Sequence, residues 1–150
     1  MAYPAGKSII GDGVDRILTR EVFLHFLDLE VKRSRRYQNF FSILVLKLDE
    51  LPNHDNGTGI QACCRRLTRL LAEEMRDSDI LGALGEKKLA VILPYADLMA
   101  GGHTRSRFES SLQFYDFGRD GFRLVIDQVC FPRDGTDTSD LLRKVAGIET

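Results

Sequence analysis

The sequence predicts an α+β domain, a mixed sheet with helices packed on its faces. Three observations predict it. Apolar residues recur at helical spacing in several segments, one long segment is almost continuously apolar, and two short apolar runs flank a glycine-containing connection. These patterns are typical of amphipathic helices, of a strand buried on both faces and of a β-hairpin. At 150 residues, the chain is long enough for one domain with a core and too short for two.

The N-terminal part is expected to contain a lead-in and a long helix. Residues 1–14 are rich in glycine and lack periodicity, so we expect a flexible lead-in, with the domain over residues 15–150. A helix is expected over residues 19–36, where apolar side chains repeat at helical spacing. The basic run Lys32–Arg36 suits the negative end of the helix dipole. We interpret this run as a solvated helix end, and a phosphate or membrane patch is the alternative.

A central strand and a second helix are expected next. Residues 40–48 form the almost continuous apolar run, and a turn-rich loop follows over residues 52–59. The helix expected over residues 60–76 is amphipathic. Its apolar positions are Ile60, Cys63, Cys64, Leu67, Leu70, Leu71 and Met75. The two cysteines are expected to face or border the core as small hydrophobic side chains.

The β-hairpin is expected within Arg76–Pro94. Apolar runs over residues 80–84 and 89–93 flank the polar connection Gly85-Glu86-Lys87-Lys88. Pro94 ends the second strand because proline donates no hydrogen bond to a ladder.

The remaining chain is expected to add a helix, a strand and a short helix. The first covers residues 96–114, although Gly101 and Gly102 make its first turn doubtful. The strand covers residues 121–131 and the last helix residues 139–146. The order helix, strand, helix, hairpin, helix, strand, helix favours a mixed sheet covered by helices.

Composition excludes several classes of protein. The formal net charge is -1, which gives no reason to expect nucleic acid or an anionic membrane as partner. The three cysteines fit reduced thiols and a cytoplasmic location better than a disulfide framework. His25, His54 and His103 are scattered, so no zinc spacing is present. No apolar run approaches the length of a membrane span.

Four segments together resemble the GGDEF domain family, the diguanylate cyclases of bacteria. Residues 15–19 are similar to the D-x-L-T opening, and Glu30–Leu46 to E-x-x-R-x-x-R followed by the first strand. Arg76–Pro94 resembles R-x-x-D-x-x-x-R-x-G-G-D-E-F-x-x-L-L-P, and Cys130–Lys144 resembles the closing P-x-D-G and L-L segments. The likeness covers roughly residues 15–146. It implies a nucleotide-cyclase-like GGDEF fold, with a central mixed, mostly antiparallel sheet flanked by helices.

The departures from the family pattern concern the catalytic site. The resemblance implies metal ligands at Lys47 and Lys87, where the family has acidic residues. A lysine is a donor-only cation and cannot coordinate Mg²⁺. The second glycine of the signature is Glu86, and the guanine-holding segment is shortened into residues 55–59. We therefore predict a degenerate domain that is not an enzyme and needs no magnesium or other cofactor.

The family's product-binding motif is kept. Arg76 and Asp79 stand in R-x-x-D, and five residues separate Asp79 from Gly85, as in the family's inhibitory site that binds cyclic di-GMP. The resemblance also implies an arginine from the helix after the hairpin. Counting from Pro94 gives Arg107, with Arg105 as the alternative. The plainer interpretation of Arg76 and Asp79 is a surface pair at a helix end.

Three functions follow from this pattern. The first is a signalling domain that binds cyclic di-GMP at Arg76, Asp79 and Arg107, alone or bridging to a second copy or to a neighbouring sensor or receiver domain. The alternative is a pseudo-enzyme without nucleotide that acts as a dimerisation or protein-docking module. The third is GTP binding without turnover by Lys47 and Lys87, against which stands their interpretation as two exposed turn lysines.

Overall fold

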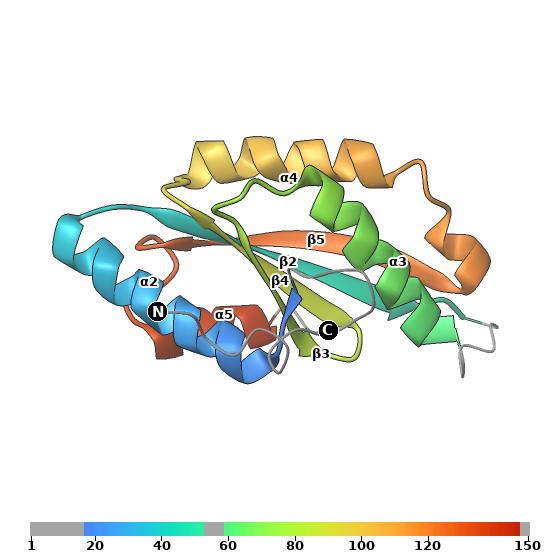
Figure 1. Cartoon of the computed structure of the whole chain (residues 1–150), viewed down its shortest axis with the longest axis horizontal. Helices are drawn as coiled ribbons and strands as arrows, with labels where there is room; N and C mark the ends of the chain where they lie inside the picture. Colours follow the sequence, from blue (N-terminus) through green and yellow to red (C-terminus); the bar gives the residue numbers. More distant parts are fainter. Residues whose placement is uncertain (1–16, 53–58, 148–150) are drawn as a thin grey trace.

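The computed structural model describes residues 17–52 and 59–147. The lead-in expected over residues 1–14 and most of the loop at 52–59 lie outside the described residues. The elements follow the expected order (Figure 1): β1 (Ile17–Leu18), α2 (Arg20–Tyr37), β2 (Phe41–Glu50), α3 (Gly59–Glu74), β3 (Ile80–Gly85), β4 (Lys88–Pro94), α4 (Leu98–Leu112), the 3-10 helix η1 (Phe117–Asp120), β5 (Phe122–Phe131) and α5 (Thr138–Gly147).

The five strands form one mixed sheet in the order β1-β3-β4-β2-β5. β1 pairs with β3 in parallel, and the other three pairings are antiparallel. The predicted hairpin is therefore confirmed as β3 and β4, and the predicted α+β class with a mostly antiparallel sheet is confirmed as well. The strand predicted to be central is β2, which lies between β4 and β5.

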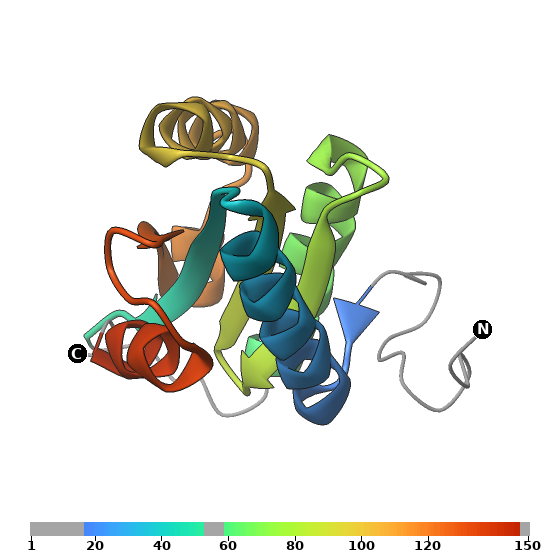
Figure 2. The ribbon, with the colours of Figure 1, turned by 90° about the vertical axis from the view of Figure 1, so that its left-hand side faces the viewer.

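Helices cover both faces of the sheet, as the sequence predicts. One core cluster joins α3 and α4 to the sheet, through Cys63, Leu67 and Phe108 among others. The second joins α2 and α5 to the opposite face, through Leu27 and Leu141 among others. Figure 2 shows the two helix layers on either side of the strands. Residues 41–48 of β2 are all buried because both layers pack on this strand.

Local contacts explain where α2 begins and how closely it packs. Thr19 caps its N-terminus, with its side chain accepting from the backbone N–H of Val22. Phe23 lies directly over Gly82 of β3, where an added Cβ would meet the phenyl ring at 2.4 Å. Glycine at this position therefore permits the close approach of helix and strand.

The doubt about the first turn of α4 was wrong. α4 begins at Leu98, and the side chain of Asp97 caps it by accepting from the N–H of Ala100 at 2.8 Å. Gly101 lies inside the helix and packs against β2, where an added Cβ would meet the hydroxyl oxygen of Ser42 at 2.5 Å. Close packing of α4 on β2 therefore outweighs the low helix propensity of glycine.

Two short elements carried too little signal to be predicted. β1 has two residues and depends on pairing with β3. The η1 turn is capped by Asp116 and ends at Gly121, which has φ 89°. Within residues 17–52 and 59–147, no helix is both long and apolar enough to cross a membrane.

Candidate functional site

The tip of the β3–β4 hairpin lies beside the end of β2, where the family resemblance implies a catalytic site. The β2–β4 register pairs Lys47 with Lys88, and the backbone N–H of Leu48 donates to the carbonyl of Lys87 at 2.9 Å. Residues of both strands and of the turn line a cavity of about 450 Å³. The strand pairing therefore brings three lysines to one cavity, not the two that the sequence singled out.

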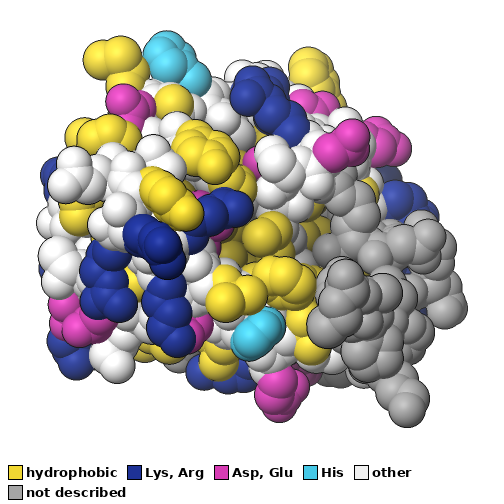
Figure 3. Space-filling model, turned by 60° about the vertical axis from the view of Figure 1, so that its left-hand side comes forward, with side chains coloured by type: hydrophobic (Ala, Val, Ile, Leu, Met, Phe, Trp, Pro, Cys, Tyr) yellow, Lys and Arg dark blue, Asp and Glu magenta, His cyan; other side chains and the backbone are white. Residues whose placement is uncertain are grey.

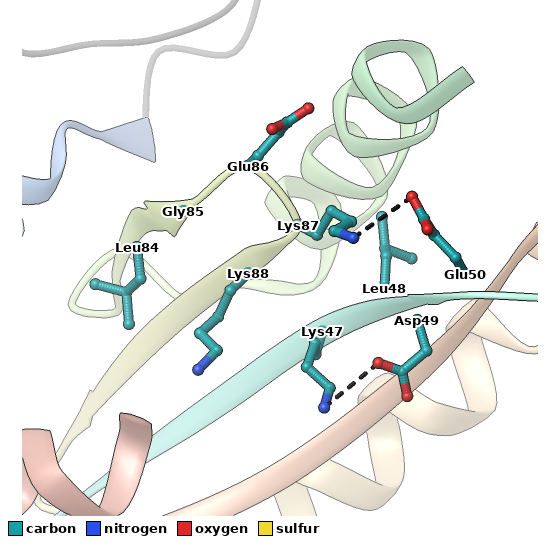
Figure 4. A pocket seen from close by; sticks show the side chains of 9 residues that line it. All are labelled: Lys47, Leu48, Asp49, Glu50, Leu84, Gly85, Glu86, Lys87 and Lys88. Carbon is teal, nitrogen blue, oxygen red and sulfur yellow. Dashed lines mark ion pairs between the residues drawn. The ribbon is translucent and has the colours of Figure 1, made fainter. Parts of the chain in front are cut away.

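Lys47 and Lys88 are both buried and point to the same side of the sheet (Figure 4). Lys47 Nζ lies 3.3 Å from Asp49 Oδ1. Lys88 Nζ donates to the carbonyl oxygen of Val145 at 3.1 Å, in the last turn of α5. A cation at the C-terminal end of a helix satisfies an otherwise orphaned carbonyl and suits the helix dipole. Lys88 therefore fastens α5 to the sheet.

Lys87 is directed away from Lys47 and toward Glu50 (Figure 4), with Nζ 3.5 Å from Glu50 Oε1. The interpretation of Lys47 and Lys87 as two exposed turn lysines was wrong for Lys47, which is buried. Side chains alternate along β2, so Lys47 falls on the face that α2 and α5 cover.

The turn is also tied to α3. The thiol of Cys64 donates to the carbonyl of Glu86 at 3.1 Å. Burial, followed by the nearby charge of Glu86, raises the pKa of Cys64 to about 11. The thiol therefore stays protonated near neutral pH and keeps its hydrogen bond. In the part of the chain that the structure describes, no three His, Cys, Asp or Glu side chains are arranged to hold a metal ion.

A second cavity lies where the α3–β3 connection meets the β4–α4 connection. It measures about 600 Å³, and Arg76, Asp79 and Arg107 all line it. Arg105 does not line it and instead pairs with Glu109 one turn along α4, at 3.4 Å. The fold thus brings together the three side chains that the resemblance implies, from two segments well separated in the sequence.

Asp79 and Arg107 are held in place by the backbone around α3. Asp79 is buried, and its Oδ2 accepts from the backbone N–H of Arg76 at 2.9 Å. Arg107 Nη2 donates to the carbonyl of Glu74 at 2.9 Å, and its Nε lies 3.7 Å from Glu74 Oε1. The arrangement is more than an exposed pair at a helix end, because the carboxylate organises the turn that carries Arg76.

Four further polar side chains line this cavity and were not singled out from the sequence: Ser78, Tyr95, His103 and Thr104. His103 and Thr104 precede Arg107 by one helical turn, so helical spacing on α4 was the available signal. Tyr95 directly follows the proline that ends β4, and nothing in its sequence neighbourhood marks it.

Comparison with models of protein families shows to which family the chain belongs. The profile described as "Diguanylate cyclase, GGDEF domain" matches residues 10–146. The chain belongs to the GGDEF domain family. Among curated proteins, none matches this GGDEF domain significantly.

Solved GGDEF domains share the fold at low sequence identity. A diguanylate cyclase protein from Thermotoga maritima has 15% identity and a TM-score of 0.73, over 91% of this chain and 98% of that one. The GGDEF domain of FimX from Pseudomonas aeruginosa has 16% identity and a TM-score of 0.75, over 91% and 89%. The GGDEF domain of DgcB from Caulobacter crescentus, solved in complex with c-di-GMP, has 12% identity and a TM-score of 0.73, over 91% and 83%.

Proposed function

We propose that this GGDEF domain is a cytoplasmic receptor that binds cyclic di-GMP without synthesising it. One observation carries the proposal: Arg76, Asp79 and Arg107 line a single cavity of about 600 Å³. The solved DgcB domain in complex with c-di-GMP adds support from the same family.

The chemistry of the three side chains suits a guanine dinucleotide. An arginine fork donates two hydrogen bonds to guanine O6 and N7. A carboxylate such as Asp79 accepts from the guanine N1–H and amino group. Arg107 supplies a cation for the phosphates, and Glu74 keeps its guanidinium in one orientation.

The hairpin tip supports the absence of cyclase activity. Phosphoryl transfer between two GTP molecules needs divalent metal held by carboxylates. Asp49 and Glu50 line the cavity at the tip, yet each forms an ion pair with a lysine. The residues present therefore do not fit Mg²⁺. The same ion pairs disfavour GTP held by Lys47 and Lys87 alone, since each lysine would first have to leave its carboxylate.

Calorimetric titration of cyclic di-GMP tests the receptor proposal. Arg76→Ala and Asp79→Asn are expected to weaken binding strongly. The asparagine keeps an oxygen that accepts from the N–H of Arg76, so the turn is preserved while the carboxylate is lost. Arg105→Ala is the matched control, because Arg105 lies on α4 like Arg107 but does not line the cavity. Equal affinity in all four proteins would reject this site.

A parallel assay tests the absence of catalysis. The purified domain, incubated with GTP and Mg²⁺ or Mn²⁺, is expected to yield no cyclic di-GMP by mass spectrometry. Product that accumulates with time and disappears in a Lys47→Ala, Lys87→Ala double variant would overturn this part of the proposal.

The second candidate function is a dimerisation module, and a different cavity favours it. Phe40, Leu98 and Met99 are exposed and line a cavity of about 640 Å³, Met99 with 73% of its surface accessible. Asp97 and Arg133, which carry opposite charges, line the same cavity, as a self-complementary two-fold interface requires. Sedimentation of the wild type and of Met99→Glu tests this candidate: a dimer that the substitution dissociates favours it, and a monomeric wild type rejects it.

A further inference from the structure

The connection between β4 and α4 places a tyrosine where glycine is favoured. The N–H of Ala96 donates to the carbonyl of Leu93 at 3.3 Å and closes a four-residue turn. Pro94 is its second residue and Tyr95 its third, with φ 63°. A proline followed by a positive φ is the pattern of a type II turn, whose third position favours Gly or Asn. A bulky side chain in this conformation is strained.

Packing in the core does not account for the tyrosine. Its side chain is 64% exposed. The guanidinium of Arg33, from α2, lies over its ring at 5.6 Å from the centroid. A strained residue that gains little burial points to a role at the surface, where such strain is commonly kept for ligand binding.

Tyr95 lies between two cavities. One is the cavity of about 600 Å³ that holds Arg76, Asp79 and Arg107. The other, of about 500 Å³, runs along α2 past Leu29 and Arg33. Apolar Leu29 and cationic Arg33 line this second cavity together with Tyr95. Figure 3 shows one face of the molecule, on which hydrophobic side chains lie next to lysine and arginine side chains. Apolar surface beside cations is the composition expected where a purine base and a phosphate bind together.

We infer that Tyr95 is a stacking platform for a base of the cyclic dinucleotide. This inference rests on the proposed function of the Arg76 site. The guanidinium of Arg33 over one face of the ring leaves the opposite face for a base, which gives a base–tyrosine–arginine sandwich. The left-handed turn keeps the ring at the shared wall of the two cavities instead of on the core.

Stacking contributes affinity without selecting guanine, because every base has an aromatic face. Guanine selection stays with Arg76 and Asp79, which reach its edge atoms. Loss of the ring is therefore expected to weaken binding of cyclic di-GMP about tenfold. The ratio of affinities for cyclic di-GMP and cyclic di-AMP is expected to remain unchanged.

The test compares Tyr95→Asn, Tyr95→Phe and Gln38→Asn with the wild type. Asparagine tolerates the left-handed conformation, so Tyr95→Asn relieves strain while removing the ring. Gln38 is the second non-glycine residue with positive φ among the described residues, at 55°, and it caps α2 away from both cavities. Thermal unfolding is expected to shift upward by about 2–4 °C in both asparagine variants.

Binding separates the variants. Titration with cyclic di-GMP is expected to show about tenfold weaker affinity only in Tyr95→Asn, with Tyr95→Phe close to wild type. In a mixed dinucleotide, one guanine is kept for Arg76 and Asp79 and the other base is 2-aminopurine. Its fluorescence is expected to be quenched by wild type and by Tyr95→Phe, and not by Tyr95→Asn. If wild type binds and Tyr95→Asn binds equally well, the stacking role is overturned while the receptor proposal stands. If wild type does not bind, both are overturned.

Discussion

The two cation-lined cavities of this domain differ in what their cations contact. At the hairpin tip, Lys47, Lys87 and Lys88 contact Asp49, Glu50 and the carbonyl of Val145, which come from β2 and α5. At the second cavity, Arg107 contacts Glu74 at the end of α3, and Arg76 and Asp79 line the same space. Lys87 and Lys88 join neighbouring elements, and Lys47 pairs within β2. Arg107 also ties α4 to α3, but it does so at the wall of a space of about 600 Å³ that Arg76 and Asp79 line as well. The positively charged side chains at the hairpin tip thus stabilise the fold, and those at the second cavity, in our proposal, also bind a ligand.

The largest expected effect separates the two cavities by binding. Arg76→Ala is expected to weaken cyclic di-GMP binding about 10- to 100-fold, the range for losing a bidentate arginine contact to guanine. Lys87→Ala, at the tip, is expected to leave the affinity unchanged. Titration calorimetry on both proteins measures this difference. A larger loss of affinity in Lys87→Ala than in Arg76→Ala would show that the ligand binds at the hairpin tip and not at the proposed cavity.

The second effect separates the cavities by stability. Lys88→Ala removes a buried side chain and its hydrogen bond to Val145, and is expected to lower the free energy of unfolding by about 2 kcal/mol. Lys87→Ala breaks a partly exposed ion pair and is expected to cost less than about 0.5 kcal/mol. Urea denaturation measures both. Equal values would contradict the role of Lys88 in fastening α5.

A smaller effect concerns the thiol that holds the turn. The pKa of Cys64 is raised from 9.0 to about 11 in the folded protein. The folded state therefore keeps the proton more tightly, so this stabilising contribution is complete below pH 9 and is lost between pH 9 and about 11. We expect a shallower fall of stability across this range in Cys64→Ala, measured by urea denaturation at each pH. An identical fall in both proteins would contradict the assignment to Cys64.

The fold was largely predictable from sequence because its main signals are strong and local. The apolar run of β2 is short and almost continuous, and the two runs of the hairpin flank a glycine-containing connection, patterns that favour strands. β1 was not predicted because two residues carry no periodicity. The first turn of α4 was doubtful from sequence because Gly101 is explained by close packing against Ser42, which lies in another element. Propensity cannot register such tertiary contacts.

The candidate site was predictable only where the family pattern keeps a fixed spacing. Counting from Pro94 selected Arg107, and the fold brings it to the cavity of Arg76 and Asp79. Tyr95 was not predicted because the feature that distinguishes it is a positive backbone φ angle, which the sequence does not show. The orientation of the Lys87 side chain toward Glu50 was not predicted because it depends on the strand register and on the turn of the hairpin.

Titration of cyclic di-GMP into the wild-type domain tests the central claim most directly. We predict saturable binding in the micromolar range or tighter, which Arg76→Ala weakens about 10- to 100-fold and Arg105→Ala retains. Absence of heat at high ligand concentration, with the protein shown to be folded by circular dichroism, would contradict the account and reduce Arg76 and Asp79 to a structural turn.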